Sequence, residues 1–292
     1  MERIKSHFMH SCRLNSNIIG LVAVENPYPF DSLNDGMDHL ALIVMESGAD
    51  DDGFEHVQIA GERVLVRRID ALKLEEQLHA FGKNRNLAYW LMRGEVLLDR
   101  GGYIYRLRER LLAFPHSMKE QKQLVEFSGF LRSYLQAKQE VNDGNLLDAH
   151  SFVLLALHYW SHIVLIEEGK HPELSVWKQM RRVHPGIYKL YEELTASPET
   201  LEQRVQLVML ACEFAVMNKM KGCCSLLIDI ITSRSEPWSI VELQSHPTVS
   251  VLDIDLSLIV HHLVKRSYIR EVAVIREPDT DGKLELQYMV SN

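Results

Sequence analysis

The chain has 292 residues, which is enough for two or three domains of ordinary size. Hydrophobic residues make up 46% of it and charged residues 25%, a balance that excludes a fibrous or largely disordered protein. The formal net charge of -8 excludes a general electrostatic attraction to nucleic acid or to an anionic membrane, so binding to either would need a local basic patch.

The apolar stretches and the cysteines predict a cytoplasmic protein with no membrane segment. The longest apolar stretch, 152–166, is interrupted by His158 and His162 and is shorter than the roughly 20 residues that cross a bilayer. Residues 1–14 carry charges and lack the apolar core of a signal peptide. The cysteines follow no disulfide or zinc-site spacing, which indicates reduced thiols at Cys12, Cys212, Cys223 and Cys224.

The first third of the chain predicts a mixed sheet with helices. A polar segment, 25–37, is rich in Asn, Asp, Pro and Gly and predicts a loop. Asp70 stands at the N-cap position of a predicted helix, 71–81. Helical periodicity also marks 1–14, 87–92 and 103–113. Apolar or alternating patterns predict strands at 18–24, 38–45, 54–60, 63–69 and 95–98.

The remainder of the chain changes character twice. No strand is predicted between 115 and 233, where long helical periods indicate a bundle around the apolar segment 146–168. Two short helices and a hairpin then predict a winged helix from 239–244, 255–265, 269–275 and 284–290. The predicted fold class is therefore α+β, with a mixed sheet and helices in 1–114, a middle helical bundle in 115–233 and a winged helix-turn-helix in 234–292.

One constellation near the N-terminus points to a chemistry. Two-metal transfer of a nucleotide needs carboxylates on one face of a strand, two residues apart, beside a turn that approaches phosphate. Here Glu25-Asn26 closes the first strand and Asp38-His39-Leu40 opens the second. This order resembles the front end of the nucleotidyltransferase fold of the DNA polymerase beta superfamily, where Gly-Ser closes the first strand and an acid-x-acid motif opens the second.

The resemblance implies a nucleoside triphosphate as substrate, Mg²⁺ as cofactor and an unknown acceptor for the nucleoside monophosphate. It implies that Asp38 is a catalytic acid and metal ligand, and that Glu25 and Asn26 bind the nucleotide. The family's third acid lies on a later strand, where only Asp70 is available, although an N-cap role for Asp70 is favoured. The segment 86–100 and the three-part layout also resemble bacterial nucleotidyltransferase-like proteins.

Two departures from the motif keep a second hypothesis open. Leu40 cannot ligate a metal, and Glu25 directs negative charge toward the expected phosphates. The alternative is a non-catalytic regulatory or scaffold protein on the same fold, which binds a macromolecule. An active enzyme requires at least two carboxylates that converge within about 4 to 6 Å of one metal position near Asp38.

Other candidate residues have ordinary interpretations. His150, His158 and His162 lie near one face of a predicted helix, and for His158 and His162 we favour packing or a pocket lining over metal binding. For Asp148 we favour an N-cap or surface role over that of a general base. A solvated helix face is expected for the basic cluster Lys178, Arg181, Arg182, His184 and Lys189.

The winged-helix segment is acidic. Residues 236–292 hold nine acidic and five basic side chains, and the expected wing tip carries Glu277, Asp279 and Asp281. Because phosphate contacts supply most non-specific affinity for DNA, DNA is an unlikely partner. We expect a wing that packs against protein, and a homodimer is one possibility.

Overall fold

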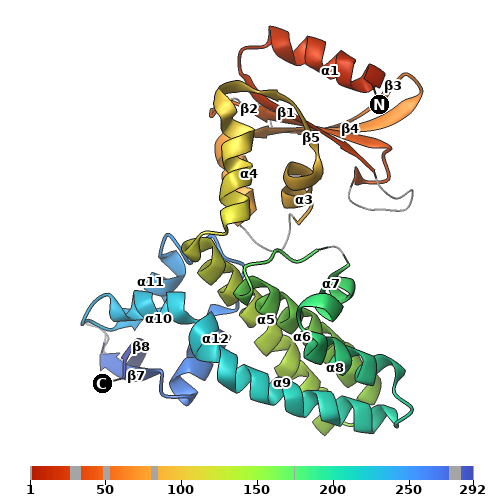
Figure 1. Cartoon of the computed structure of the whole chain (residues 1–292). Coiled ribbons are helices and arrows are strands. Elements are labelled where there is room, and N and C mark those ends of the chain that lie inside the picture. Colours follow the sequence, from red (N-terminus) through yellow and green to blue (C-terminus); the bar gives the residue numbers. More distant parts are fainter. Residues whose placement is uncertain are drawn as a thin grey trace. The chain divides into compact units, whose positions relative to one another are not determined.

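The computed structural model describes residues 2–26, 34–48, 53–79, 85–173, 175–275 and 284–291. The chain divides into two compact units, Met1–Pro115 and His116–Asn292 (Figure 1). The fold class predicted from the sequence is confirmed, because a mixed sheet with helices is followed by a helical bundle and a winged helix. The wing tip with Glu277, Asp279 and Asp281 lies outside the described residues.

The first unit is built on a five-stranded mixed sheet with the order β3-β4-β2-β1-β5. Strands β2 and β4 pair in parallel, and the other neighbours pair antiparallel. β2 is buried along its whole length, as its continuous apolar sequence predicts for a central strand. The strands are β1 (Ile18–Glu25), β2 (His39–Met45), β3 (Gly53–Ile59), β4 (Glu62–Asp70) and β5 (Glu95–Asp99).

Helices lie on both faces of this sheet (Figure 1). On one face, α1 (Glu2–Leu14) packs Ile4, Phe8 and Cys12 against apolar residues of β1, β2 and β4. The Arg100 guanidinium stabilises the end of α1 by donating to the carbonyl oxygens of Arg13, Asn15 and Ser16 at 2.7 to 3.0 Å. The other helices are α2 (Ala71–His79), α3 (Arg85–Arg93), the short 3-10 helix η2 (Arg100–Gly102) and α4 (Tyr103–Ala113).

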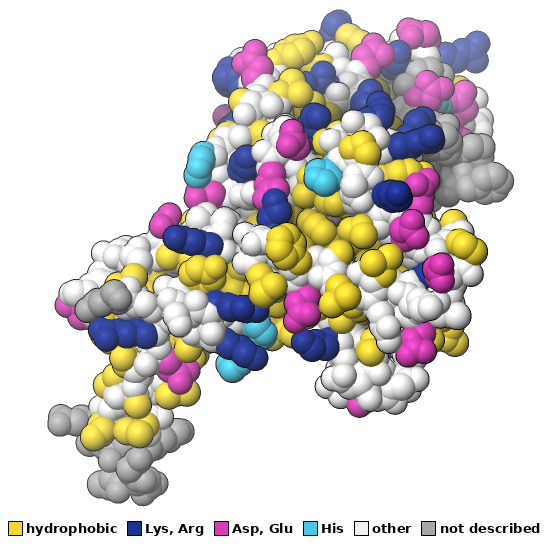
Figure 2. Space-filling view, turned by 60° about the horizontal axis from the view of Figure 1, so that its bottom comes forward, with side chains coloured by type: hydrophobic (Ala, Val, Ile, Leu, Met, Phe, Trp, Pro, Cys, Tyr) yellow, Lys and Arg dark blue, Asp and Glu magenta, His cyan; other side chains and the backbone are white. Residues whose placement is uncertain are grey.

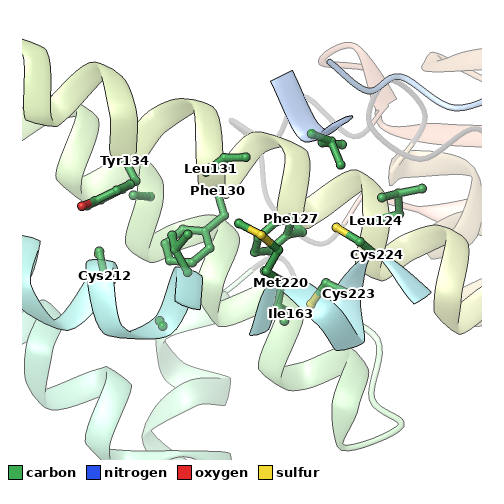
Figure 3. Packing of buried hydrophobic residues seen from close by; sticks show 14 of the residues in the cluster. Leu124, Phe127, Phe130, Leu131, Tyr134, Ile163, Cys212, Met220, Cys223 and Cys224 are labelled. Carbon is green, nitrogen blue, oxygen red and sulfur yellow. The ribbon is translucent and has the colours of Figure 1, made fainter. Parts of the chain in front are cut away.

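The second unit begins with a bundle whose core is formed mainly by α5, α6 and α9. Figure 3 shows Phe127 and Phe130 of α5 packed with Met220 and Cys223 of α9. In the part of the chain that the structure describes, α6 is the one helix long and apolar enough to cross a membrane, and 56% of its most apolar window is buried inside the protein. The bundle consists of α5 (His116–Asn142), α6 (Leu146–Glu167), α7 (Val176–Val183), α8 (Pro185–Ala196) and α9 (Leu201–Cys223).

A winged helix completes the second unit and shares its core. The three-stranded sheet has the order β6-β8-β7, and Leu256, Ile259 and Leu263 belong to the same buried cluster as Phe127. The backbone N–H of Asp255 donates to Ser128 Oγ of α5 at 2.8 Å. The predicted boundary at 233 therefore separates two segments with one continuous core. The elements are α10 (Ser225–Thr232), β6 (Trp238–Ser239), α11 (Ile240–Ser245), α12 (Leu256–Lys265), β7 (Ile269–Ile275) and β8 (Leu284–Val290).

Candidate functional site

The residues of the expected nucleotide site meet at one end of the first unit's sheet, where β1 ends and β2 begins. Asn26 follows β1, and its backbone N–H donates to the carbonyl oxygen of Asp38 at 3.0 Å. Its side-chain Nδ2 donates to the carbonyl oxygen of Met37 at 3.0 Å. Asn26 therefore joins the two ends of the connection between β1 and β2. Glu25 ends β1 with an exposed side chain, and the nucleotide-binding roles of both residues remain predictions.

Asp38 is paired with an arginine. Its Oδ2 accepts the backbone N–H of Arg63 at 2.9 Å, and its Oδ1 lies 3.5 Å from Nη2 of the same residue. The N–H and the guanidinium of Arg63 lower the pKa of the Asp38 carboxyl below its ordinary value, so the carboxylate is ionised at neutral pH. The pairing follows from the parallel register of β2 and β4, in which His39 lies opposite Val64.

The position of the motif's second acid belongs to the hydrophobic core. Leu40 is two residues from Asp38, so both side chains leave the same face of the sheet. Leu40 is only 1% exposed. At the position of the motif's second metal ligand, a buried leucine therefore stands in place of a carboxylate.

The opposite face of the sheet, at the same end of β2 and β4, holds a contact between two side chains that was not predicted from the sequence. The imidazole Nε2 of His39 contacts the carboxylate of Glu62, the first residue of β4. Because neighbouring strand residues alternate between faces, Glu62 and His39 are directed away from the face of Arg63 and Asp38. Only the register between β2 and β4 reveals this pair, since 23 residues separate its members in the sequence.

Asp70 lies at the other end of this strand pair from Asp38 and has the N-cap role that the sequence favours, while a catalytic role for it stays a prediction. In the parallel pair of strands Asp70 lies opposite Met45, six residues from the His39 level, which places it about 20 Å from Asp38. Its Oδ1 accepts the N–H groups of Leu72 at 2.8 Å and Lys73 at 3.3 Å, and its Oδ2 accepts that of Gly48 at 2.7 Å. Asp70 is thus an N-cap for α2 and a tether for the turn after β2.

This cap predicts a pH-dependent contribution to stability. Burial acts to raise the pKa of Asp70, but the N–H groups of Gly48, Lys73 and Leu72 outweigh it and the pKa is lowered. The stabilisation is present above the ordinary carboxyl pKa and is lost as the pH falls below about 4. We expect Asp70→Asn to be less stable than the native chain at pH 7, with a difference that shrinks in acid. Urea unfolding at several pH values measures it, and a difference that stays constant would contradict the cap.

The donor set near Asp38 does not fit a magnesium site in the described ranges. Mg²⁺ takes oxygen ligands, and two-metal sites share several carboxylates. Asp38 has apolar Leu40 on one side and the cationic Arg63 on the other. No group of three or more His, Cys, Asp or Glu side chains that could hold a metal occurs among the residues described.

A cluster of titratable side chains is buried between α5 and α6. The rings of His158 and His162 lie 4.3 Å apart, and His162 Nδ1 lies 3.0 Å from Glu126 Oε1. Lys122 Nζ lies 3.1 Å from His171 Nδ1 in the segment that follows α6. These contacts support the packing interpretation of His158 and His162.

Lys122 in this cluster predicts a stability that depends on pH. Burial lowers the pKa of Lys122 to about 7, and the charge of Glu126 partly opposes this effect. Because the unfolded chain keeps its proton up to a pKa of 10.5, the buried lysine disfavours folding below about pH 7 and this penalty is relieved as the pH rises toward 10.5. The free energy of unfolding of Lys122→Met, relative to the native chain, should therefore be highest near pH 6 and fall toward pH 10. A difference in the free energy of unfolding that stays constant from pH 6 to pH 10 would contradict this prediction.

The remaining candidates have local roles or lie on the surface. Asp148 is exposed in the first turn of α6, and His150 is half-buried. In the basic cluster, His184 Nδ1 accepts the N–H of Ile187 at the start of α8, and Arg182 Nη2 lies 3.6 Å from Glu173. The start of α12, the helix that would enter DNA in a helix-turn-helix, is packed on α5.

Comparison with known proteins places this architecture in a family. Residues 1–119 match the description Nucleotidyltransferase-like, residues 120–219 a YgxA-like substrate binding domain, and residues 225–278 a Helix-turn-helix domain. The chain is 30% identical over 270 residues to the uncharacterized protein YgxA of Bacillus subtilis strain 168, covering 92% of this chain and 91% of the relative. The crystal structure of a nucleotidyltransferase-like protein from Exiguobacterium sibiricum 255-15 superposes with a TM-score of 0.81 at 28% identity, covering 99% and 97% of the two chains.

Proposed function

Because the chain belongs to the family of nucleotidyltransferase-like proteins that includes YgxA of Bacillus subtilis, we propose that it keeps this fold for binding and not for nucleotidyl transfer. It acts as a regulatory or scaffold protein whose partner is a macromolecule. One observation carries this proposal: Asp38, the one acid of the motif that this chain keeps, accepts the backbone N–H of Arg63 and lies 3.5 Å from its guanidinium.

The charges around Asp38 disfavour nucleotidyl transfer. A carboxylate pair is needed to offset the charge of two divalent ions, and those ions offset the charge of the triphosphate. With Leu40 in the core, Asp38 alone cannot supply this balance. A metal at the same place would be repelled by the Arg63 guanidinium, which lies 3.5 Å from Asp38 Oδ1.

Binding functions are supported by the rest of the chain. The helical segment matches a substrate-binding description, and the last segment matches a helix-turn-helix description. The acidic composition of residues 236–292 and the packing of Asp255 on Ser128 favour a protein partner over DNA for the winged helix.

Transfer of a nucleoside monophosphate to an acceptor is the second candidate. It is favoured by the position of Asp38 at the start of β2 and by its lowered pKa, which keeps the carboxylate ionised. In that case Mg²⁺ and a nucleoside triphosphate would be bound at this end of the sheet.

Pyrophosphate release separates the two candidates. The native chain, Asp38→Ala and Arg63→Ala are each incubated with ATP, GTP, CTP or UTP and with Mg²⁺ or Mn²⁺. Arg63→Ala is included because it removes the guanidinium from Asp38. We expect no release by the native chain above that of Asp38→Ala. Release that requires Asp38 would overturn the binding proposal and establish transfer.

A further inference from the structure

Helix α9 carries a second apolar stripe on the side opposite to the one in the core. The inner stripe, which includes Val205, Val208 and Cys212, is buried. The outer stripe consists of Leu207, Leu210, Phe214 and Met217, which are 49%, 66%, 66% and 38% exposed. Figure 2 shows hydrophobic side chains lying open among charged ones on the face that it turns forward. An exposed row of four large apolar side chains on one helix is typical of an interaction surface.

The spacing of the outer stripe fits a helix partner. Steps of three, four and three residues are those of the a and d positions of a coiled coil. The four positions lie symmetrically about Cys212, two and five residues to either side. A two-fold axis at that level would pair Leu207 with Met217 of a second copy and Leu210 with Phe214 of that copy. Self-complementarity of this kind is what a two-fold interface between identical chains requires.

The polar flanks select the antiparallel direction. Glu202 lies near the start of α9 and Lys221 near its end, and both are exposed. In two antiparallel copies the turn that carries Glu202 lies level with the turn that carries Lys221 of the other copy, whereas parallel copies would place like charges level with each other. Near the axis, Lys138 and Glu213 form an ion pair at 3.4 Å along the edge of the stripe, so opposite charges are also available there.

We propose that two copies of this chain associate through the outer stripe of α9, antiparallel and centred on Cys212. This interface does not depend on whether the nucleotide site is active. A membrane is a poorer match for the stripe, because helices that bind anionic membranes are rich in free Lys and Arg. The basic residues of α9 are Arg204, Lys219 and Lys221, of which Arg204 donates to the carbonyl oxygen of Leu194 and Lys219 is paired with Glu167.

Sedimentation of the full chain over about 1 to 100 µM tests the proposal. The native chain should be dimeric at the upper concentrations, and Leu210→Glu or Phe214→Glu should raise the dissociation constant at least about 100-fold, because each charge occurs twice at the centre of the interface. Val241→Glu is the matched control, since Val241 is 64% exposed on α11, and it should leave the dimer unchanged. Circular dichroism confirms that the variants fold. A native chain that stays monomeric, or a dimer that persists in Leu210→Glu, would overturn the proposal.

Cysteine cross-linking tests the direction. Mixing a Leu207→Cys chain with a Met217→Cys chain should give a disulfide under mild oxidation. Neither chain alone should do so, because equivalent positions lie about 15 Å apart along antiparallel helices and a disulfide needs Cα atoms within about 7 Å. The native cysteines are buried and do not compete. Self-linking of Leu207→Cys would show a parallel pair and overturn the antiparallel arrangement.

Discussion

Replacing Leu40 with Asp is expected to unfold the first unit and not to create a metal site. The substitution restores the family's acid-x-acid pattern with Asp38, but Leu40 is 1% exposed and surrounded by the core of the sheet. Burying an unpaired carboxylate there should lower the free energy of unfolding by more than about 4 kcal/mol. Thermal unfolding followed by circular dichroism measures this effect.

The control for this prediction is the same substitution at a surface leucine of the same unit. Leu72 is 61% exposed in the first turn of α2, where a negative charge interacts favourably with the helix dipole. Leu72→Asp should change the stability by less than about 0.5 kcal/mol. If Leu40→Asp folded as well as Leu72→Asp and gained affinity for Mg²⁺, position 40 could carry a metal ligand, and its assignment to the hydrophobic core would not explain the missing acid.

Gly94→Ala is expected to destabilise the first unit by about 3 kcal/mol. Gly94 joins α3 to β5 directly over β1. A Cβ atom at this position would lie 2.6 Å from the carbonyl oxygen of Trp90 and 2.9 Å from Cγ2 of Val24, and it would also overlap Val22. The backbone oxygen cannot move aside without disturbing the end of α3, which Arg108 stabilises by donating to the carbonyl oxygen of Leu91 at 2.6 Å. Urea unfolding of the variant measures the loss.

Gly53→Ala is the matched control, because a Cβ atom there would meet no other atom within 4 Å. Gly53 is the first residue of β3 in the same unit, and its substitution should be neutral or slightly stabilising. Equal effects of the two substitutions would show that close packing over β1 does not explain the glycine at position 94.

The fold could be predicted from the sequence because its signals are local. The apolar run of β2 and the cap at Asp70 each specify their own element. Together these local signals predict the order of strands and helices along the chain, and the family resemblance supplies the topology. The continuous core between α5 and α12 was not predictable, since Ser128 and Asp255 are 127 residues apart.

The candidate site depended on register, which the sequence does not display. Arg63 meets Asp38 only because β2 and β4 pair in parallel across 25 residues, and Glu62 meets His39 for the same reason. The acid-x-acid comparison identified Leu40 as the departure, but the arginine that compensates Asp38 required the structure. Similarly, the sequence shows that α9 is apolar on two sides, and only the packing shows which side is exposed.

Electron paramagnetic resonance of Mn²⁺ measures whether Asp38 is a ligand of a divalent metal. The free Mn²⁺ signal is recorded during titration of the native chain and of Asp38→Ala, alone and with a non-hydrolysable analogue of each nucleoside triphosphate. We expect equal free Mn²⁺ for the two proteins under every condition, because Asp38 is paired with Arg63 and the second carboxylate of the motif is replaced by the buried Leu40. Uptake of Mn²⁺ by the native chain that disappears in Asp38→Ala would show that Asp38 holds a metal and would overturn the binding proposal.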